Sequence, residues 1–167
     1  MIDRALPIAF ASALLAACSP QAGAENTAVA EAPAQEAQAV SRHPVSGLEV
    51  VPLTVDTGDQ THRFRVEVAR TREAQNRGLM ERPPLGDDEG MIFPYKTAAV
   101  QGFWMKNTPS PLDIIYVGED GRILNIITGE PYSEKNLISD GHANLVLEIR
   151  GGRAAELGIE PGDVVAW

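Results

Sequence analysis

Two short stretches of the sequence carry side chains that can bind a ligand or transfer a proton. They contain Trp104, Lys106, Asn107, Thr108 and Asp113 in the first stretch, and His142, Asn144 and Glu148 in the second. Together these residues supply aromatic surface, a cation, an imidazole, two carboxylates, and amide and hydroxyl groups. A small-molecule site needs a few such polar groups beside apolar walls, so we treat all of them as candidate ligand-binding residues.

Asp113 is the most informative of these residues because it interrupts an apolar run. Residues 112–117 predict a strand that is apolar on both faces, on which Asp113 shares a face with Ile115 and Val117. A strand of this kind is covered on both sides, which places the carboxylate in or near the core. Burial of an ionised carboxylate is costly unless a cation or backbone amides receive it. The nearest candidate donors lie in the loop 106–111, which two prolines stiffen.

Three functions from different classes fit these residues. The first is a small-ligand-binding or accessory module, in which Trp104 supplies an apolar wall. In this hypothesis Lys106, a cation in a stiff loop, meets an anionic or polar ligand. The hypothesis requires the candidate side chains to converge on one concavity.

The second function is an enzyme of hydrolase type that uses Asp113 and Glu148 as a carboxylate pair. Two carboxylates in unequal environments can divide acid and base roles, with His142 as a general base or metal ligand. No Gly-x-Ser-x-Gly, His-x-x-x-His or Walker-type pattern occurs, and the acidic run 87–89 lacks the alternating ligands of a calcium loop. The sequence therefore favours a protein that is not an enzyme, and it predicts neither a cofactor nor a metal site.

The third function is a purely structural or protein-interaction domain. Here Asp113 accepts hydrogen bonds from the amides of the 106–111 loop, and Glu148 pairs with an arginine on a neighbouring strand. Trp104 would belong to the core and His142 would face solvent. For Asp113 taken alone, this structural role is the favoured one.

Composition excludes several classes of function. The 167 residues carry 14 basic and 23 acidic side chains, which gives a formal net charge of −9. No basic cluster offsets this charge, so we expect no nucleic-acid binding. Cys18 is the only cysteine, which rules out an intramolecular disulfide and a cysteine-based zinc site.

The N-terminus predicts export and lipid attachment. Arg4 precedes an apolar stretch, residues 5–17, that is too short to span a bilayer as a helix. The run Leu15-Ala16-Ala17-Cys18 resembles the bacterial lipobox, in which the signal is removed before a cysteine that carries lipid. Acyl chains on Cys18 would anchor the protein to the membrane. The alternative is an ordinary signal peptide that is cut nearby and leaves a free thiol.

We therefore expect a lipid-anchored, periplasm-facing protein of the bacterial cell envelope. Ser19 follows the cysteine, and a serine at this position resembles the residue found there in lipoproteins that are exported to the outer membrane. The expected parts are a signal peptide over 1–17, Cys18 with a flexible tether over 18–46, and a single globular domain over 47–167. The tether is rich in alanine, glutamate, glutamine, proline and serine and has no aromatic residue. The expected partners are the membrane, a small anionic or polar ligand, and an envelope protein.

Hydrophobic alternation and turn residues predict a β-rich domain with two short helices. The expected strands cover 48–56, 61–69, 91–93, 101–105, 112–117, 122–128, 142–149 and 164–166, and the expected helices cover 72–77 and 153–157. Pro94 should end the third strand, and 129–141 should be a polar loop. The fold class is α+β, β-rich: a small barrel or a strongly curled mixed or antiparallel sheet.

Several motifs, taken in their order, resemble those of a known family. They are Gly78-Leu79-Met80, Gly90-Met91-Ile92-Phe93, Phe103-Trp104-Met105-Lys106-Asn107-Thr108, Pro111-Leu112-Asp113, Asp120-Gly121, Val146-Leu147-Glu148, and Gly158-Ile159 followed by Gly162-Asp163. Over residues 48–166 the chain resembles the bacterial and archaeal family called domain of unknown function 192. The resemblance implies a compact β-rich fold with few helices, and no assigned activity.

Overall fold

The computed structural model of the protein describes residues 41–167. The predicted signal peptide, Cys18 and most of the predicted tether lie outside the described residues. Within 41–167 the chain forms seven strands and two short helices. They are β1 (Val50–Asp56), β2 (Thr61–Val68), α1 (Arg72–Arg77), β3 (Glu89–Phe103), β4 (Leu112–Val117), β5 (Ile123–Gly129), β6 (Leu137–Arg150), α2 (Arg153–Leu157) and β7 (Val164–Ala166).

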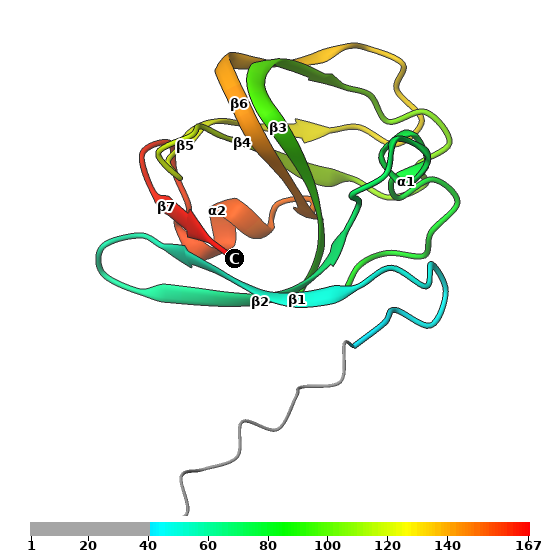
Figure 1. Ribbon diagram of the computed structural model, residues 1–167, viewed down its shortest axis with the longest axis horizontal. Helices are drawn as coiled ribbons and strands as arrows, with labels where there is room; N and C mark the ends of the chain where they lie inside the picture. Colours follow the sequence, from blue (N-terminus) through cyan, green and yellow to red (C-terminus); the bar gives the residue numbers. More distant parts are fainter. Residues whose placement is uncertain (1–40) are drawn as a thin grey trace, which may run out of the picture. The chain divides into compact units, whose positions relative to one another are not determined.

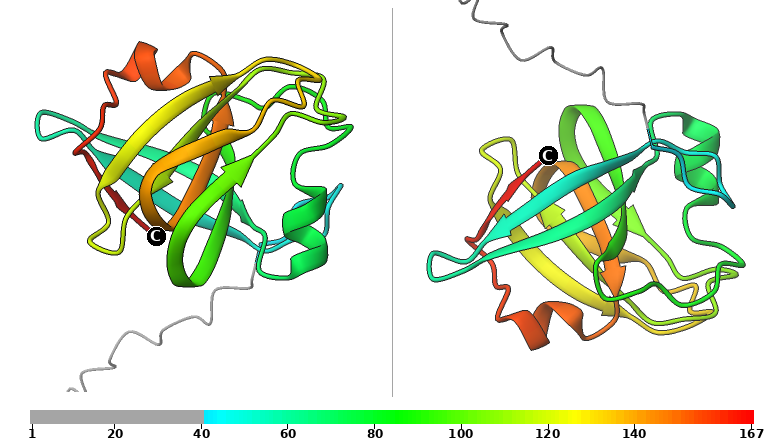
Figure 2. Two further views of the ribbon diagram at one scale, coloured as in Figure 1. Left: turned by 90° about the horizontal axis from the view of Figure 1, so that it is seen from above. Right: turned by 90° about the horizontal axis from the view of Figure 1, so that it is seen from below.

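The strands form one curled sheet in the order β5-β4-β6-β3-β2-β1-β7. In this part of the chain β2 and β3 run parallel, and the other neighbouring strands are antiparallel. The two ends of the sheet meet at a bridge between Arg122 and Val164, beside which the Val165 N–H donates to the Gly121 carbonyl at 2.8 Å. The sheet therefore curls almost into a barrel, with the two helices at opposite ends of it (Figures 1 and 2). The predicted fold class is confirmed.

Each face of the sheet covers its own apolar core because the side chains of a strand alternate between faces. The first core takes side chains from all seven strands and from α2, among them Phe64 and Leu147, and fills the inside of the curl. The second core lies on the other face of β3, β4 and β6, where Phe93 and Tyr116 pack with Leu79 from the turn after α1. Since β4 contributes to both cores, it is buried along its whole length, as its sequence predicts.

Two strands are longer than the sequence predicts. Residues 89–103 form one continuous strand, so the prediction of two short strands separated at Pro94 is wrong. The pairing with β2 ends at Ile92, which leaves β3 a free edge where the missing N–H of a proline is tolerated. The other strand, β6, begins at Leu137, inside the predicted polar loop, because residues 137–143 pair with the far half of β3.

Residues 41–46, which the sequence assigns to the tether, contact the domain through a buried carboxylate. Glu67 is only 3% exposed and accepts hydrogen bonds from the Ser46 hydroxyl and, at 2.8 Å, from Arg82. His43 lies 3.7 Å from the same carboxylate. A buried charge requires partners of this kind. The Glu67–Arg82 pair therefore holds the start of the domain against β2 and the segment that follows α1.

Asp113 is buried, as predicted, but its hydrogen-bond donors differ from the predicted ones. The Thr128 hydroxyl donates to it at 2.7 Å, and the backbone N–H groups of Gly152 and Ala154 donate at 3.0 and 2.9 Å. The prediction that the loop 106–111 supplies the donors is wrong, because Asp113 faces the inside of the curl, where α2 begins. Its carboxylate satisfies two N–H groups at the start of that helix.

Replacing the Asp113 carboxylate should weaken the attachment of α2. In Asp113→Asn a neutral amide stands among three donors, and we expect the free energy of unfolding to fall by about 1–3 kcal/mol. Thr128→Val removes a single donor and should cost less. Urea unfolding followed by circular dichroism measures both changes, and a midpoint that is the same in Asp113→Asn as in the wild type would contradict the assigned role.

Candidate functional site

Helix α1 lies on the sheet and packs against the second core through Ala74, its one hydrophobic side chain. The Thr71 hydroxyl accepts a hydrogen bond from the Ala74 N–H at 3.1 Å, and the helix ends at Gly78 with φ 47° and ψ −133°, a conformation that favours glycine. Both ends are as the sequence predicts. No residue of the helix is buried. The Gln75 side chain donates to the Pro94 carbonyl at 3.1 Å and so ties the helix to β3.

A cavity of about 720 Å³ lies between α1, β3, β6 and the segment after β3. Polar side chains line it from the helix side and mostly aromatic ones from the sheet side, with one carboxyl from β6. The main lining residues are Arg72, Gln75, Asn76 and Arg77 of α1, Met80, Phe93, Tyr95 and Phe103, and Trp104, Thr108 and Glu148. Its volume is in the range that holds a small organic molecule.

Glu148 is the only carboxyl group among the lining residues, and it has no partner in the part of the chain that the structure describes. It is 4% exposed, and no hydrogen bond or ion pair to its carboxyl is present among residues 41–167. Its cross-strand neighbours are Met91 on β3 and Ile114 on β4, both apolar. The prediction that Glu148 pairs with an arginine of a neighbouring strand is therefore wrong.

Burial without a partner changes the protonation of Glu148. Desolvation by burial raises its pKa from 4.5 to about 8, because burial disfavours the charged form. Burial, and secondarily the nearby Glu148 carboxyl, raise the pKa of Tyr95 to about 12. The same two causes raise the pKa of Tyr116, whose hydroxyl donates to the Leu137 carbonyl at 2.8 Å. At neutral pH the cavity therefore holds a neutral carboxylic acid beside neutral phenols.

Three of the eight sequence-predicted residues line this cavity: Trp104, Thr108 and Glu148. Lys106 is not among the lining residues. Its ammonium lies 5.1 Å from the centre of the Trp104 ring and 3.7 Å from a Glu134 carboxylate oxygen. The lysine therefore lies over the face of the Trp104 ring and beside Glu134.

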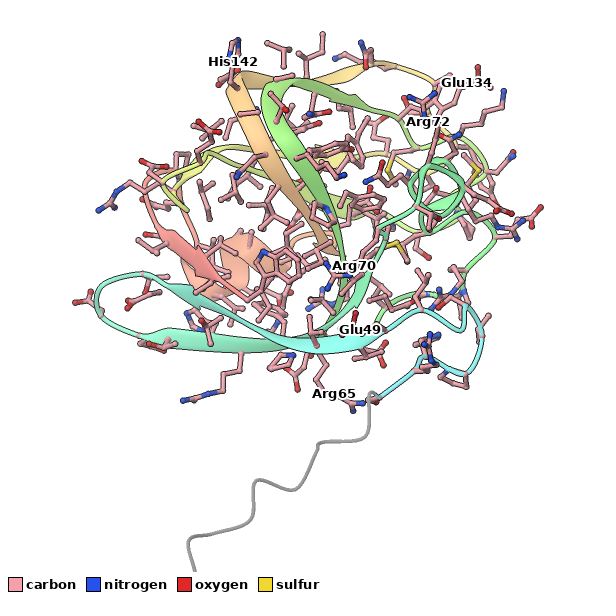
Figure 3. The ribbon with its side chains drawn as sticks, viewed as in Figure 1. Glu49, Arg65, Arg70, Arg72, Glu134 and His142 are labelled. Atoms are coloured by element: carbon pink, nitrogen blue, oxygen red, sulfur yellow. The ribbon has the colours of Figure 1, made fainter. Side chains whose placement is uncertain are left out.

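The remaining predicted residues do not converge on the cavity. Asn107 has φ 55°, and its carbonyl accepts the Glu81 N–H at 2.8 Å, which gives it a role in loop structure. His142 is an exposed residue of β6 opposite Val100 of β3, far from Arg72 of α1 in Figure 3. Asn144, two residues further along β6, is half-buried and is not among the cavity's lining residues.

Asp113 and Glu148 do not form a carboxylate pair. In the register of β4 with β6, Asp113 lies opposite Ile149 and Glu148 lies opposite Ile114. Cross-strand partners point to the same face of a sheet, and successive residues point to opposite faces. Asp113 therefore faces the inside of the curl and Glu148 faces the cavity, so the two groups cannot act on one substrate.

Sequence analysis missed the contribution of α1. Arg72, Asn76 and Arg77 all line the cavity, and none of them is among the candidates. The signal that could have identified them is the helix sequence Arg-Glu-Ala-Gln-Asn-Arg, which has no large apolar residue and so gives no packing reason for a helix there. Tyr95 was also missed, because the predicted strand ended at Pro94.

The loops beside the cavity contain all three non-glycine residues with positive φ in the described part of the chain. These are Glu81, Asn107 and Tyr132, with φ of 59°, 55° and 60°. They belong to one hydrogen-bonded cluster, since the Glu81 N–H donates to Asn107 and the Tyr132 N–H donates to the Thr108 carbonyl. Such conformations cost energy and concentrate at functional sites, which agrees with the position of the cavity.

Among residues 41–167 no three histidine, cysteine, aspartate or glutamate side chains are placed to hold a metal ion. No helix in this range has the length and hydrophobicity needed to cross a bilayer.

The raised pKa of Glu148 should make stability depend on pH. Between about pH 4.5 and pH 8 the folded state keeps a proton that the unfolded chain has released, so the free energy of unfolding falls as pH rises through this window. Glu148→Gln keeps a neutral side chain of similar shape and should remove this fall. From about pH 5 to about pH 8.5 the free energy of unfolding, measured with urea, should fall by on the order of a few kcal/mol more in the wild type than in Glu148→Gln. The same pH dependence in both would contradict the assignment.

Comparison with known proteins places the chain in a family that has no assigned activity. The family DUF192 (Uncharacterized ACR, COG1430) matches residues 53–167. None of the curated proteins matches the chain. A solved structure of a protein of unknown function from Novosphingobium aromaticivorans DSM 12444 is 53% identical with a TM-score of 0.75, and the match covers 79% of this chain and 95% of that one. Another, from Sinorhizobium meliloti 1021, carries the provisional name of a transcription regulator; it is 32% identical with a TM-score of 0.69, over 71% of this chain and 94% of that one. The chain therefore belongs to the DUF192 family.

Proposed function

We propose that the domain binds a small molecule in the cavity beneath α1 and serves as the binding module of a lipid-anchored protein of the bacterial envelope. The observation that carries the first part is Glu148, a buried residue whose carboxyl opens onto the cavity and has no hydrogen-bond or ion-pair partner among residues 41–167. An unpartnered buried polar group destabilises a fold. A ligand that hydrogen-bonds to Glu148 would remove this cost, and it would explain why a carboxyl group occupies this position.

The composition of the cavity supports binding over catalysis. Aromatic side chains such as Phe103 and Trp104 offer a surface for an apolar body, and the α1 side chains offer hydrogen bonds at the mouth. The proposed hydrolytic pair loses its geometric basis, because Asp113 lies on the other face of the sheet. The lining residues include no serine, cysteine, lysine or histidine that could act as a nucleophile or its base.

The envelope location is proposed on the sequence alone. Residues 5–17 and the run that ends at Cys18 have the form of a lipoprotein signal, and the alanine-rich segment after it suits a tether. We place the anchor in the outer membrane because Ser19 follows the cysteine. The net charge of −9 does not favour the DNA contacts that the name of the Sinorhizobium relative would imply.

A neutral fluorescent probe tests the cavity. Phenylnaphthylamine, which brightens in apolar surroundings, should bind the full chain carrying Cys18→Ser, a form that bears no lipid. Asn76→Trp places an indole at the mouth of the cavity and should weaken binding about tenfold. Glu73→Trp, on the side of α1 that faces away from the cavity, is the matched control. The proposal fails if the probe does not bind or if both tryptophan variants bind it equally.

Lipid attachment has a separate test. In a bacterial host that processes lipoproteins, the wild-type chain should incorporate labelled palmitate and sediment with the membrane fraction. Cys18→Ser should lose the label, and Ser19→Ala, which leaves the cysteine intact, should keep it. An unlabelled wild-type chain would sink the anchoring proposal.

A further inference from the structure

The charged side chains that line the cavity do not balance one another. They are Arg72, Arg77 and Glu148. Arg77 is paired with Glu81 at 2.9 Å, whereas Arg72 makes no hydrogen bond or ion pair with any residue in 41–167. The mouth of the cavity therefore presents one uncompensated cation, which a ligand can neutralise.

The floor of the cavity does not offset this cation. Because burial raises the pKa of Glu148 to about 8, the group is mostly protonated at neutral pH. A neutral carboxylic acid offers one O–H donor and one carbonyl acceptor. The site thus combines a positive mouth with a neutral, hydrogen-bonding floor.

The walls between mouth and floor are apolar and ordered. Phe93 and Phe103 pack edge to face, with ring centroids 4.9 Å apart, and Trp104 is 48% exposed beside them. Such walls favour a flat or aliphatic ligand body over a fully hydrated ion.

We infer, on the basis of the proposed function, that the ligand is an organic anion with an apolar body, whose acidic group pairs with Arg72 and whose body lies against Phe103. A cationic ligand would meet the like charge of Arg72 at the mouth, and so the same arrangement selects against amines.

This inference predicts tighter anion binding at lower pH. When Glu148 ionises, its negative charge opposes an anion in the same cavity. The other titratable or charged groups around it are Tyr95 on β3, Tyr116 on β4 and, across the cavity, Arg72 and Arg77 on α1. Burial raises the pKa of both phenols, which keeps them protonated between about pH 6 and pH 9, so the pH dependence comes from Glu148.

A matched pair of probes tests the charge of the ligand. Anilinonaphthalene sulfonate has the ring system of phenylnaphthylamine plus one permanent negative charge. In the full chain carrying Cys18→Ser, the sulfonate should bind about tenfold tighter than the neutral probe near pH 6. Arg72→Gln should bring the ratio of the two dissociation constants close to one. Arg65→Gln is the matched control, because it removes another exposed arginine that Figure 3 places far from Arg72. The ratio of the two dissociation constants should stay as in the wild type.

The outcomes separate this inference from the function on which it rests. Binding of the neutral probe without an advantage for the sulfonate, or an advantage that survives Arg72→Gln, overturns the anion assignment and leaves the binding function standing. Failure of both probes overturns both. The advantage should also shrink between about pH 6 and pH 9 in the wild type and stay constant in Glu148→Gln; a constant advantage in both removes Glu148 from the inference.

Discussion

The antiparallel register of β4 with β6 is the constraint on which the rest of the site depends. It sets Asp113 opposite Ile149 and Glu148 opposite Ile114, and so sends two carboxyl groups of adjacent strands to opposite faces of one sheet. On one face the start of α2 supplies N–H donors to Asp113. On the other face Glu148 meets apolar neighbours and a cavity. The same chemical group is thus a structural acceptor in one place and an unpartnered acid in the other.

Within the described residues α1 packs against the second core only through Ala74, and the cavity lies beside this contact. Six residues are too few for a helix that is stable alone, so its position depends on the Thr71 cap, the turn at Gly78 and the bond from Gln75 to β3. An apolar side chain on the helix would fill the space between helix and sheet. The polar composition of α1 keeps that space open and gives it a polar mouth, while the aromatic side chains of β3 keep its inner wall apolar.

Local pattern was sufficient for the fold class and for the burial of 112–117, since both depend on alternation along short segments. It also located α1, whose cap and terminal glycine are neighbours in sequence. It could not locate the donors to Asp113, which come from α2 and β5, because pairing between distant segments leaves no local trace. For the same reason local pattern grouped Lys106 with Glu148, although the Lys106 ammonium lies over the Trp104 ring and Lys106 does not line the cavity. The sequence predicts a strand end at Pro94. The proline is tolerated within β3 because the pairing with β2 ends at Ile92, and the local sequence does not show where that pairing ends.

The meeting of the two ends of the sheet bears on how copies of the chain behave beside one another. An open sheet ends in strands whose N–H and C=O groups can pair with another molecule, which is the usual start of edge-to-edge aggregation. Here the terminal strand β7 is three residues long, and the bridge between Arg122 and Val164 ties it to the opposite end of the sheet. Copies crowded together can therefore extend the sheet less readily at β7 than along the part of β3 beyond Ile92, whose edge is free.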